Sequence, residues 1–281
     1  MTLPSLSAST SFSLAAVFAW GTSDFVGGYG ARRTNAFLLT AIAHLSGLLL
    51  IVGVALGTHS PFPSRTALVW ALMGGLSGGG ALAIFYRALA TGRMGLTAPV
   101  AAVLGAAIPT VVGMFREGLP QSAQIAGFVL AAVGIWLISR TEDDSPPEGI
   151  GMAALAGIGF AGFYLCAKQA GDDSAFWIAA TVKISSFALT GIIVLAGNGA
   201  RKIDLGGTAF GALAGCLDVI GSVLFIRASQ TGRMDAAVVL SSLYPAVTVL
   251  LARLILKEHF TRWKALGMVA ALLAVPMIAW R

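Results

Sequence analysis

Charged residues are scarce in this chain: Asp, Glu, Lys and Arg make up 11% of its 281 residues, against 57% hydrophobic residues. A soluble domain carries about 25% charged residues, so the composition argues against a water-soluble fold. Cysteine is also rare, because Cys166 and Cys216 are the only two and show neither CxxC nor Cys/His spacing. We therefore expect no disulfide framework and no metal site. The residues before Leu14 carry no charged side chain, so we expect no cleaved signal peptide.

Several functional classes lack their sequence signals. The formal net charge is +6, but the basic residues are scattered singly among loops, which argues against nucleic acid and fits lipid head groups. No HExxH motif and no paired carboxylates with a plausible metal partner occur in mid-span, so we expect no enzyme and no cofactor. GIGFAG, Gly157–Gly162, matches GxGxxG but follows no strand, so we discard a dinucleotide site. A membrane-embedded enzyme stays as the less favoured alternative.

Long apolar runs are abundant. Runs of about 20 residues, the length that crosses a bilayer as a helix, recur along the whole chain. They are continuously apolar rather than alternating, which excludes a β-barrel, and helices satisfy the backbone in lipid. The sequence predicts an all-α integral membrane protein with ten transmembrane helices near residues 11–30, 36–57, 66–90, 95–114, 121–139, 149–169, 174–196, 207–229, 234–256 and 263–280.

An internal repeat organises these helices. FYRALATGRM, Phe85–Met94, returns 140 residues later as FIRASQTGRM, Phe225–Met234, with seven of ten positions identical. We divide the chain into a first five-helix repeat, 1–140, an acidic and proline-containing linker, 141–148, and a second repeat, 149–281. Because five is odd, the second repeat enters the bilayer inverted. Inverted repeats are typical of transporters that hold a midplane site between two halves, so we expect a central cavity.

The repeated TGRM segment ends the third and eighth predicted helices. Its glycines can take the left-handed conformation that stops a helix, and its arginines lie at head-group level. One interpretation is a turn with basic anchors; the other is a pair of gates, one on each face. The candidate gating and hinge residues are Arg87, Gly92, Arg93, Arg227, Gly232, Arg233 and, in the ninth helix, Pro245.

Ionisable residues deep in a membrane span are costly and are candidates for function. His44, Lys183 and Asp218 fall near the middle of their predicted spans, and Asp24 lies one turn beyond Trp20. His44 and Lys183 are counterparts at an offset of 139 residues, so both are expected beside the central cavity. The alternative is a set of satisfied interhelical contacts, such as a pair between Lys183 and Asp218.

Aromatic residues and a proline extend the candidate site. Pro245 falls mid-way through the predicted helix 234–256 and removes a backbone hydrogen bond, which frees a carbonyl near Ser242. The alternative for the aromatic residues is simple helix packing. The full set assigned to substrate binding is Trp20, Asp24, His44, Phe163, Lys183, Asp218, Ser242 and Tyr244. The glycine-rich GGLSGGG, Gly74–Gly80, favours close helix packing through small residues four apart.

The stretch Ala236–Val275 resembles the second half of an EamA repeat of the drug/metabolite transporter superfamily, with Pro245, Glu258 and Gly267 at the motif positions. The first repeat matches less well, since Glu117 and Gly127 are in place but Pro109 is displaced. The resemblance implies a secondary carrier of a bacterial inner membrane with cytoplasmic termini. YddG-like aromatic amino acid exporters are the most similar type.

Loop charges disagree with that orientation. By our topology, nine Lys and Arg residues lie opposite the termini and five lie beside them, and positive residues favour the cytoplasmic side. We follow the resemblance and expect cytoplasmic termini.

The combined expectation is a monomer in a lipid bilayer that exports amino acids, including aromatic and other neutral ones, or similar small metabolites by alternating access. A broad-specificity drug or cation exporter of the same fold is the alternative. Proton coupling and facilitated diffusion both stay open.

Overall fold

The structure is a computed structural model, and it describes residues 3–117, 121–139, 148–197, 205–231, 237, 240–241, 243–258 and 261–278. The regular elements in these ranges are all helices, which confirms the all-α prediction. Their bounds are α1 Leu3–Ala31, α2 Ala36–Gly57, α3 Arg65–Thr91, α4 Met94–Glu117, α5 Ser122–Ser139, α6 Ile150–Ala170, α7 Ala175–Ala196, α8 Leu205–Thr231, α10 Tyr244–Ile255 and α11 Arg262–Ile278.

Five of the described helices, α2, α3, α6, α7 and most of α8, are long and apolar enough to cross a membrane. Large apolar side chains also cover the outside, for example Phe18, Leu49 and Leu195, which are 65%, 66% and 79% exposed. Exposed apolar surface of this extent fits contact with lipid. Ten membrane crossings stay a prediction.

Polar caps explain where several helices begin. The Asn35 side chain accepts hydrogen bonds from the backbone N–H groups of Phe37 and Leu38 at the start of α2, and Ser64 caps α3. Such caps satisfy N–H groups that the helix itself leaves unpaired.

The expected left-handed glycine at the end of α3 is wrong. Gly92 has an extended conformation, with φ −96° and ψ −173°. A Cβ at this position would collide with the carbonyl oxygen of Glu148. The left-handed residue is instead Gly149, with φ 84°, whose backbone lies against Gly92 and Ala88. Glycine is therefore required at 92 for a close approach to the start of the second repeat.

The predicted helix 234–256 is divided at its proline. Leu240 and Ser241 are helical, Leu243 forms a turn, and α10 begins at Tyr244 with Pro245 in its first turn. Proline is tolerated there because the first helical N–H groups have no partner within the helix. The expectation of a proline in mid-helix is therefore wrong, and Ser242 lies outside the described residues.

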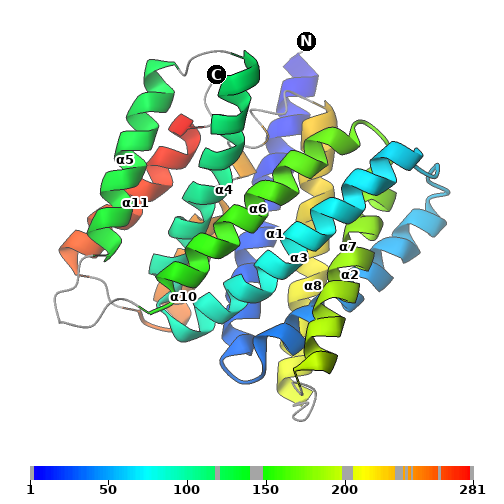
Figure 1. Cartoon of the computed structure of the whole chain (residues 1–281), viewed down its shortest axis with the longest axis horizontal. Coiled ribbons are helices and arrows are strands. Elements are labelled where there is room, and N and C mark those ends of the chain that lie inside the picture. The colour runs from blue at the N-terminus through cyan, green and yellow to red at the C-terminus, as the bar shows by residue number, and fades with distance from the viewer. Residues whose placement is uncertain are drawn as a thin grey trace.

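The most extensive helix packing joins the two predicted halves. In Figure 1, α5 packs with α11 on one side of the molecule, and α2 lies beside α7 on the other. Between them α1 pairs with α8 and α3 pairs with α6. The start of α1 and the end of α11 lie near the same edge of the view. The halves are thus interleaved rather than placed side by side as separate bundles.

The glycine-rich segments confirm the packing interpretation. Gly74 and Gly78 face α6, where added Cβ atoms would lie 3.2 Å from Cys166 Cβ and 3.1 Å from Phe163 Cβ. Gly79 faces α7, and an added Cβ there would lie 2.5 Å from the Cβ of Ser186. Small residues on two faces of α3 therefore let α6 and α7 approach it closely.

Candidate substrate cavity

A cavity of about 70 Å³, measured as the space open to the centres of water molecules, lies where seven helices meet. One water needs roughly 10–15 Å³ by this measure, so several waters or a small polar group fit. Helices of both halves line it. The lining residues are Trp20, Asp24, His44, Gly78, Gly79, Leu82, Phe160, Phe163, Tyr164, Val182, Lys183, Ser186, Asp218, Ser222 and Tyr244.

Seven of the eight residues assigned to substrate binding from sequence line this one cavity, and the eighth, Ser242, lies outside the described residues. The structure therefore brings together residues from six helices that are far apart in sequence. Their role in binding a substrate stays a prediction.

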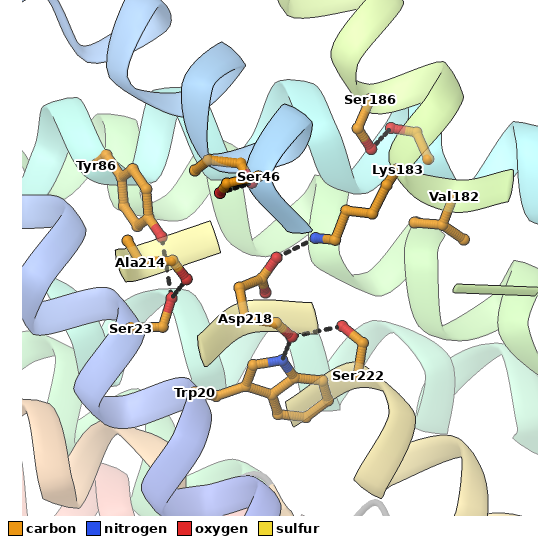
Figure 2. A network of polar contacts seen from close by, with 12 residues as sticks. Trp20, Ser23, Ser46, Tyr86, Val182, Lys183, Ser186, Ala214, Asp218 and Ser222 are labelled. Carbon is orange, nitrogen blue, oxygen red and sulfur yellow. Dashed lines mark hydrogen bonds and ion pairs between the residues drawn. The ribbon is translucent and has the colours of Figure 1, made fainter. Parts of the chain in front are cut away.

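An ion pair crosses the cavity. The Lys183 ammonium donates to the Asp218 carboxylate, and the two side chains are only 4% and 14% exposed. Figure 2 shows this pair between α7 and α8. The pairing weighed as an alternative from sequence is thus present. Since each charge compensates the other, neither is fully available to a ligand in this conformation.

The backbone of Asp218 ties α8 to α1. Its carbonyl oxygen accepts hydrogen bonds from Trp20 Nε1 at 3.2 Å and from Ser222 Oγ at 2.9 Å (Figure 2). The indole is therefore held in a fixed orientation at the cavity wall. A buried Trp N–H needs a hydrogen-bond partner, and this partner fixes the ring and thereby the shape of the cavity wall.

His44 is buried at 2% exposure, and neither of its ring nitrogens has a hydrogen-bond partner in the described structure. The backbone of Gly79 lies close to the ring without completing a bond of normal geometry, and Lys183 is near enough to interact with it electrostatically. A buried polar group without a partner is costly. His44 therefore holds unused hydrogen-bonding capacity at the cavity.

Asp24 is 6% exposed, and no side chain in the described part of the chain donates to its carboxylate. It interacts electrostatically with Asp218 and with the phenols of Tyr164 and Tyr244. Asp24 is thus the one acidic lining residue in the described structure whose charge has no counterion.

Aromatic rings form the wall around Asp24. Trp20 and Tyr244 meet edge to face with centroids 6.2 Å apart. Phe225 does not line the cavity but packs against this group, with its ring centroid 5.5 Å from that of Trp20 and 5.7 Å from that of Tyr164. The wall is therefore a packed aromatic cluster with polar edges.

Sequence reasoning missed several lining residues. Tyr164 follows the predicted Phe163 directly, Ser186 lies three residues after Lys183, and Ser222 lies four after Asp218. Residues three and four apart share a helix face, so that spacing was the signal for the two serines. Leu82, Phe160 and Val182 carry no polar signal and could not be separated from ordinary core residues.

Dense packing separates the cavity from the end of the molecule where α3 stops. Ser23 Oγ donates to the Ala214 carbonyl oxygen at 2.8 Å and lies 3.2 Å from the Tyr86 hydroxyl (Figure 2). Phe85, Tyr86 and Leu89 are all 0% exposed. This layer closes the cavity on that side.

At the same end of the molecule, the carboxylate of Glu258 in the second half binds groups of the first half. Glu258 accepts hydrogen bonds from the backbone N–H groups of Met94 at 3.1 Å and Gly95 at 3.2 Å, at the start of α4. It also forms an ion pair with Arg32 at 3.3 Å. Anionic groups are favourable at a helix N-terminus. Sequence reasoning noted Glu258 as a motif residue but did not foresee these partners.

The gating candidates that the structure describes do not line the cavity, although Pro245 directly follows the lining residue Tyr244. Arg87, Arg93 and Arg227 are exposed, and Arg227 stacks over the ring of Phe176 at 5.3 Å. Their exposed positions fit basic residues that anchor the helix ends at the lipid head groups. A role in gating stays a prediction. Gly232 and Arg233 lie outside the described residues.

The opposite end has its own contacts between halves. The Asp173 carboxylate accepts a hydrogen bond from the Ser64 backbone N–H at 2.9 Å. Hydrogen bonding by the side chain and the backbone of Ser64 holds the pKa of this carboxyl below its ordinary value. Gln230 donates to the Asp173 carbonyl oxygen at 2.8 Å, and Trp177 Nε1 donates to the Ser60 carbonyl oxygen at 3.0 Å. The α6–α7 connection therefore holds the starts and ends of neighbouring helices together.

Comparison with known proteins agrees with this architecture. Residues 147–280 match the EamA-like transporter family, which covers the second predicted repeat. The match is to a transporter family and, with the long apolar helices, supports a multi-pass membrane protein.

Solved structures show the same fold. One, described only as the crystal structure of a protein, has a TM-score of 0.67 and 17% identity, and the similarity covers 96% of each chain. No curated protein matches the chain.

Proposed function

Because the second half of the chain matches a transporter family and both halves line one polar cavity, we propose that the protein is a secondary transporter of the bacterial inner membrane. It exports amino acids, including aromatic and other neutral ones, or similar small metabolites. The observation that carries this proposal is the cavity itself, where His44, Lys183, Asp218 and Asp24 meet. Buried ionisable groups in a membrane protein mark solute pathways.

The pairing of the helices supports the proposal of alternating access between two inverted repeats. When α1 to α5 are set against α6, α7, α8, α10 and α11, the α1–α8 pairing corresponds to α6–α3, and α2–α8 corresponds to α7–α3. The α2–α7 and α5–α11 pairings correspond to themselves. This pattern supports a two-fold axis through the cavity. Two related halves of this kind can exchange which face is open.

The cavity itself is built from repeat counterparts. In the alignment of the two repeats, His44 corresponds to Lys183 at an offset of 139 residues. Gly78 corresponds to Asp218 at the offset of 140 that relates the two TGRM segments, and all four residues line the cavity. The corresponding positions of the two halves thus both line the cavity but carry different side chains. An asymmetric lining of this kind lets a substrate with two different ends bind in one orientation.

An amino acid suits the distribution of polar groups. Its ammonium is placed beside Asp24, and its carboxylate accepts hydrogen bonds from His44 and, once the ion pair opens, from Lys183. An aromatic or apolar side chain packs on Trp20, Phe163 and Tyr244. The Lys183–Asp218 ion pair thus neutralises both charges before substrate binds, and it opens when a zwitterionic substrate binds.

Transport assays with reconstituted protein test the proposal. Labelled amino acids and cationic dyes are measured in proteoliposomes with and without a pH gradient. We expect saturable transport of neutral and aromatic amino acids, reduced at least tenfold in Lys183→Ala and unchanged in Lys168→Ala, an exposed lysine at the end of α6. Wild-type rates in a folded Lys183→Ala protein contradict the assigned role.

The same assay separates the alternatives. Transport of cationic dyes without amino acids favours the drug or cation exporter, for which the uncompensated Asp24 is the supporting observation. A dependence on the pH gradient shows proton coupling, whereas its absence shows facilitated diffusion. Accessibility of single cysteines placed at the two ends of the molecule tests whether the termini face the cytoplasm.

A further inference from the structure

The charges that line the cavity do not balance. Lys183 and Asp218 compensate each other in their ion pair, and His44 is uncharged in its ordinary neutral form. Asp24 is left as a carboxylate without a counterion among the described residues. An isolated carboxylate in a low-dielectric region is unfavourable, so an ammonium that enters the cavity stabilises the ionised form of Asp24 by pairing with it.

The surroundings of Asp24 suit one kind of cation. Tyr164, Tyr244 and Trp20 line the same cavity as Asp24, and Trp20 packs edge to face on Tyr244. Aromatic faces attract ammonium groups through cation–π interactions, and several rings around one position form a cage for amines. Three rings and a carboxylate at one wall therefore favour an ammonium over a hydrated metal ion.

We propose that Asp24, with Trp20, Tyr164 and Tyr244, is an amine-recognition site and the main determinant of substrate class. This inference rests on the proposed transport through the cavity. Substrates carry a protonated primary or secondary amine on an apolar or aromatic body. A carboxylate is an optional second group, so monoamines that lack one are also substrates.

The assignment to Asp24 rather than Asp218 follows from their contacts. The Asp218 carboxylate already holds the Lys183 ammonium. Binding an amine at Asp218 requires this pair to break, whereas binding at Asp24 requires no contact to be lost.

The same contacts disfavour an anionic substrate. The one lysine that lines the cavity in the described structure is engaged with Asp218. His44 is free to hydrogen-bond a hydroxyl or carboxylate, because both of its ring nitrogens lack partners. It supplies a polar contact without a fixed charge, which explains how the site takes zwitterions as well as amines.

Three ligands with the same phenyl ring test the inference: phenethylamine, phenylalanine and 3-phenylpropionate. Binding is measured by calorimetry on the purified full chain in nanodiscs, and transport in proteoliposomes. We expect phenethylamine and phenylalanine to bind, and 3-phenylpropionate to bind at least tenfold more weakly. Asp24→Asn lowers the affinity for phenethylamine about tenfold or more, as for loss of a charged hydrogen bond. Asp172→Asn, at an exposed acid between α6 and α7, leaves it unchanged.

A second pair of variants keeps the test decisive if Asp24→Asn fails to fold. Tyr164→Phe keeps the aromatic face and retains phenethylamine binding, whereas Tyr164→Leu lowers it severalfold. A purely structural role for the ring predicts the same loss for 3-phenylpropionate and phenethylamine. Selective loss of the amine supports the site.

The outcomes distinguish this inference from the proposed function. Transport of phenylalanine without binding of phenethylamine overturns the amine site and leaves amino acid export standing. Binding of phenethylamine without transport of phenylalanine supports the amine site and overturns amino acid export. Equal affinities for phenethylamine and 3-phenylpropionate, or unchanged amine binding in a folded Asp24→Asn protein, overturn the inference directly.

Discussion

Removing one member of the buried ion pair should destabilise the protein far more than removing both. Lys183 and Asp218 are 4% and 14% exposed, so either charge left alone stays in a low-dielectric region. Breaking a buried pair in this way costs about 3–5 kcal/mol, whereas replacing both charges with neutral groups is often close to neutral. We expect Lys183→Met to cost an amount in that range and Lys183→Met/Asp218→Asn to recover most of it.

The two single variants should differ because Asp24 interacts electrostatically with Asp218. In Lys183→Met, the carboxylates of Asp218 and Asp24 face each other without a cation. In Asp218→Asn, Lys183 loses its partner, but the repulsion between the two acidic residues is removed as well. We therefore expect Asp218→Asn to be the milder change.

Thermal unfolding of purified protein in nanodiscs measures this cycle. One kcal/mol shifts the Tm by about 2–4 °C in a chain of 150–250 residues, so Lys183→Met should lower it by roughly 10 °C. Lys168→Met is the control and should stay within about 2 °C of wild type, as expected for a surface change. A double variant whose Tm falls by the sum of both single losses would refute the reasoning, because it would show that the charges are not coupled.

Three further predictions concern other parts of the fold. Glu258→Ala should lower stability by about 1–2 kcal/mol in chemical unfolding, since α4 loses its acidic cap and Arg32 its partner; an equal loss in Arg32→Ala would show that the ion pair alone matters. Gly79→Val should reduce the yield of folded protein by size-exclusion chromatography, because α7 leaves no room for a side chain; a normal yield would contradict the close packing. The Asp173 carboxyl has a pKa held below its ordinary value by the Ser64 hydrogen bond, so its stabilising contribution is present above the ordinary aspartate pKa and is lost as the pH falls through the lowered one. Tm measured against pH should therefore fall less steeply in acid for Asp173→Asn than for wild type.

Sequence reasoning reached the helices and the polar lining because both leave direct signals. Apolar runs of membrane length predict spans, and an ionisable residue within such a run stands out. His44 and Lys183 were placed together by the internal repeat, and the cavity contains both.

What sequence reasoning missed depends on contacts between distant elements. The partners of Glu258 lie 164 residues away in α4 and 226 residues away at Arg32, and no local pattern relates them. The conformation of Gly92 was also wrong, because a glycine after a helix suggests a left-handed cap. Here the closeness of the Glu148 carbonyl requires the glycine instead.

The interleaved packing has a consequence for how such a chain can be assembled. Side chains bond to carbonyl oxygens across the halves, as Ser23 does to Ala214 and Ser77 to Gly159, so a single half would turn these groups toward lipid. Neither half is therefore a self-sufficient bundle, although two halves made as separate chains have the surfaces needed to find each other. In the proposed inverted-repeat arrangement, the self-matched α2–α7 and α5–α11 contacts are those that an antiparallel homodimer of one five-helix chain would make. The covalent connection then chiefly guarantees one copy of each half, which allows the two copies to differ in the residues they present to the cavity.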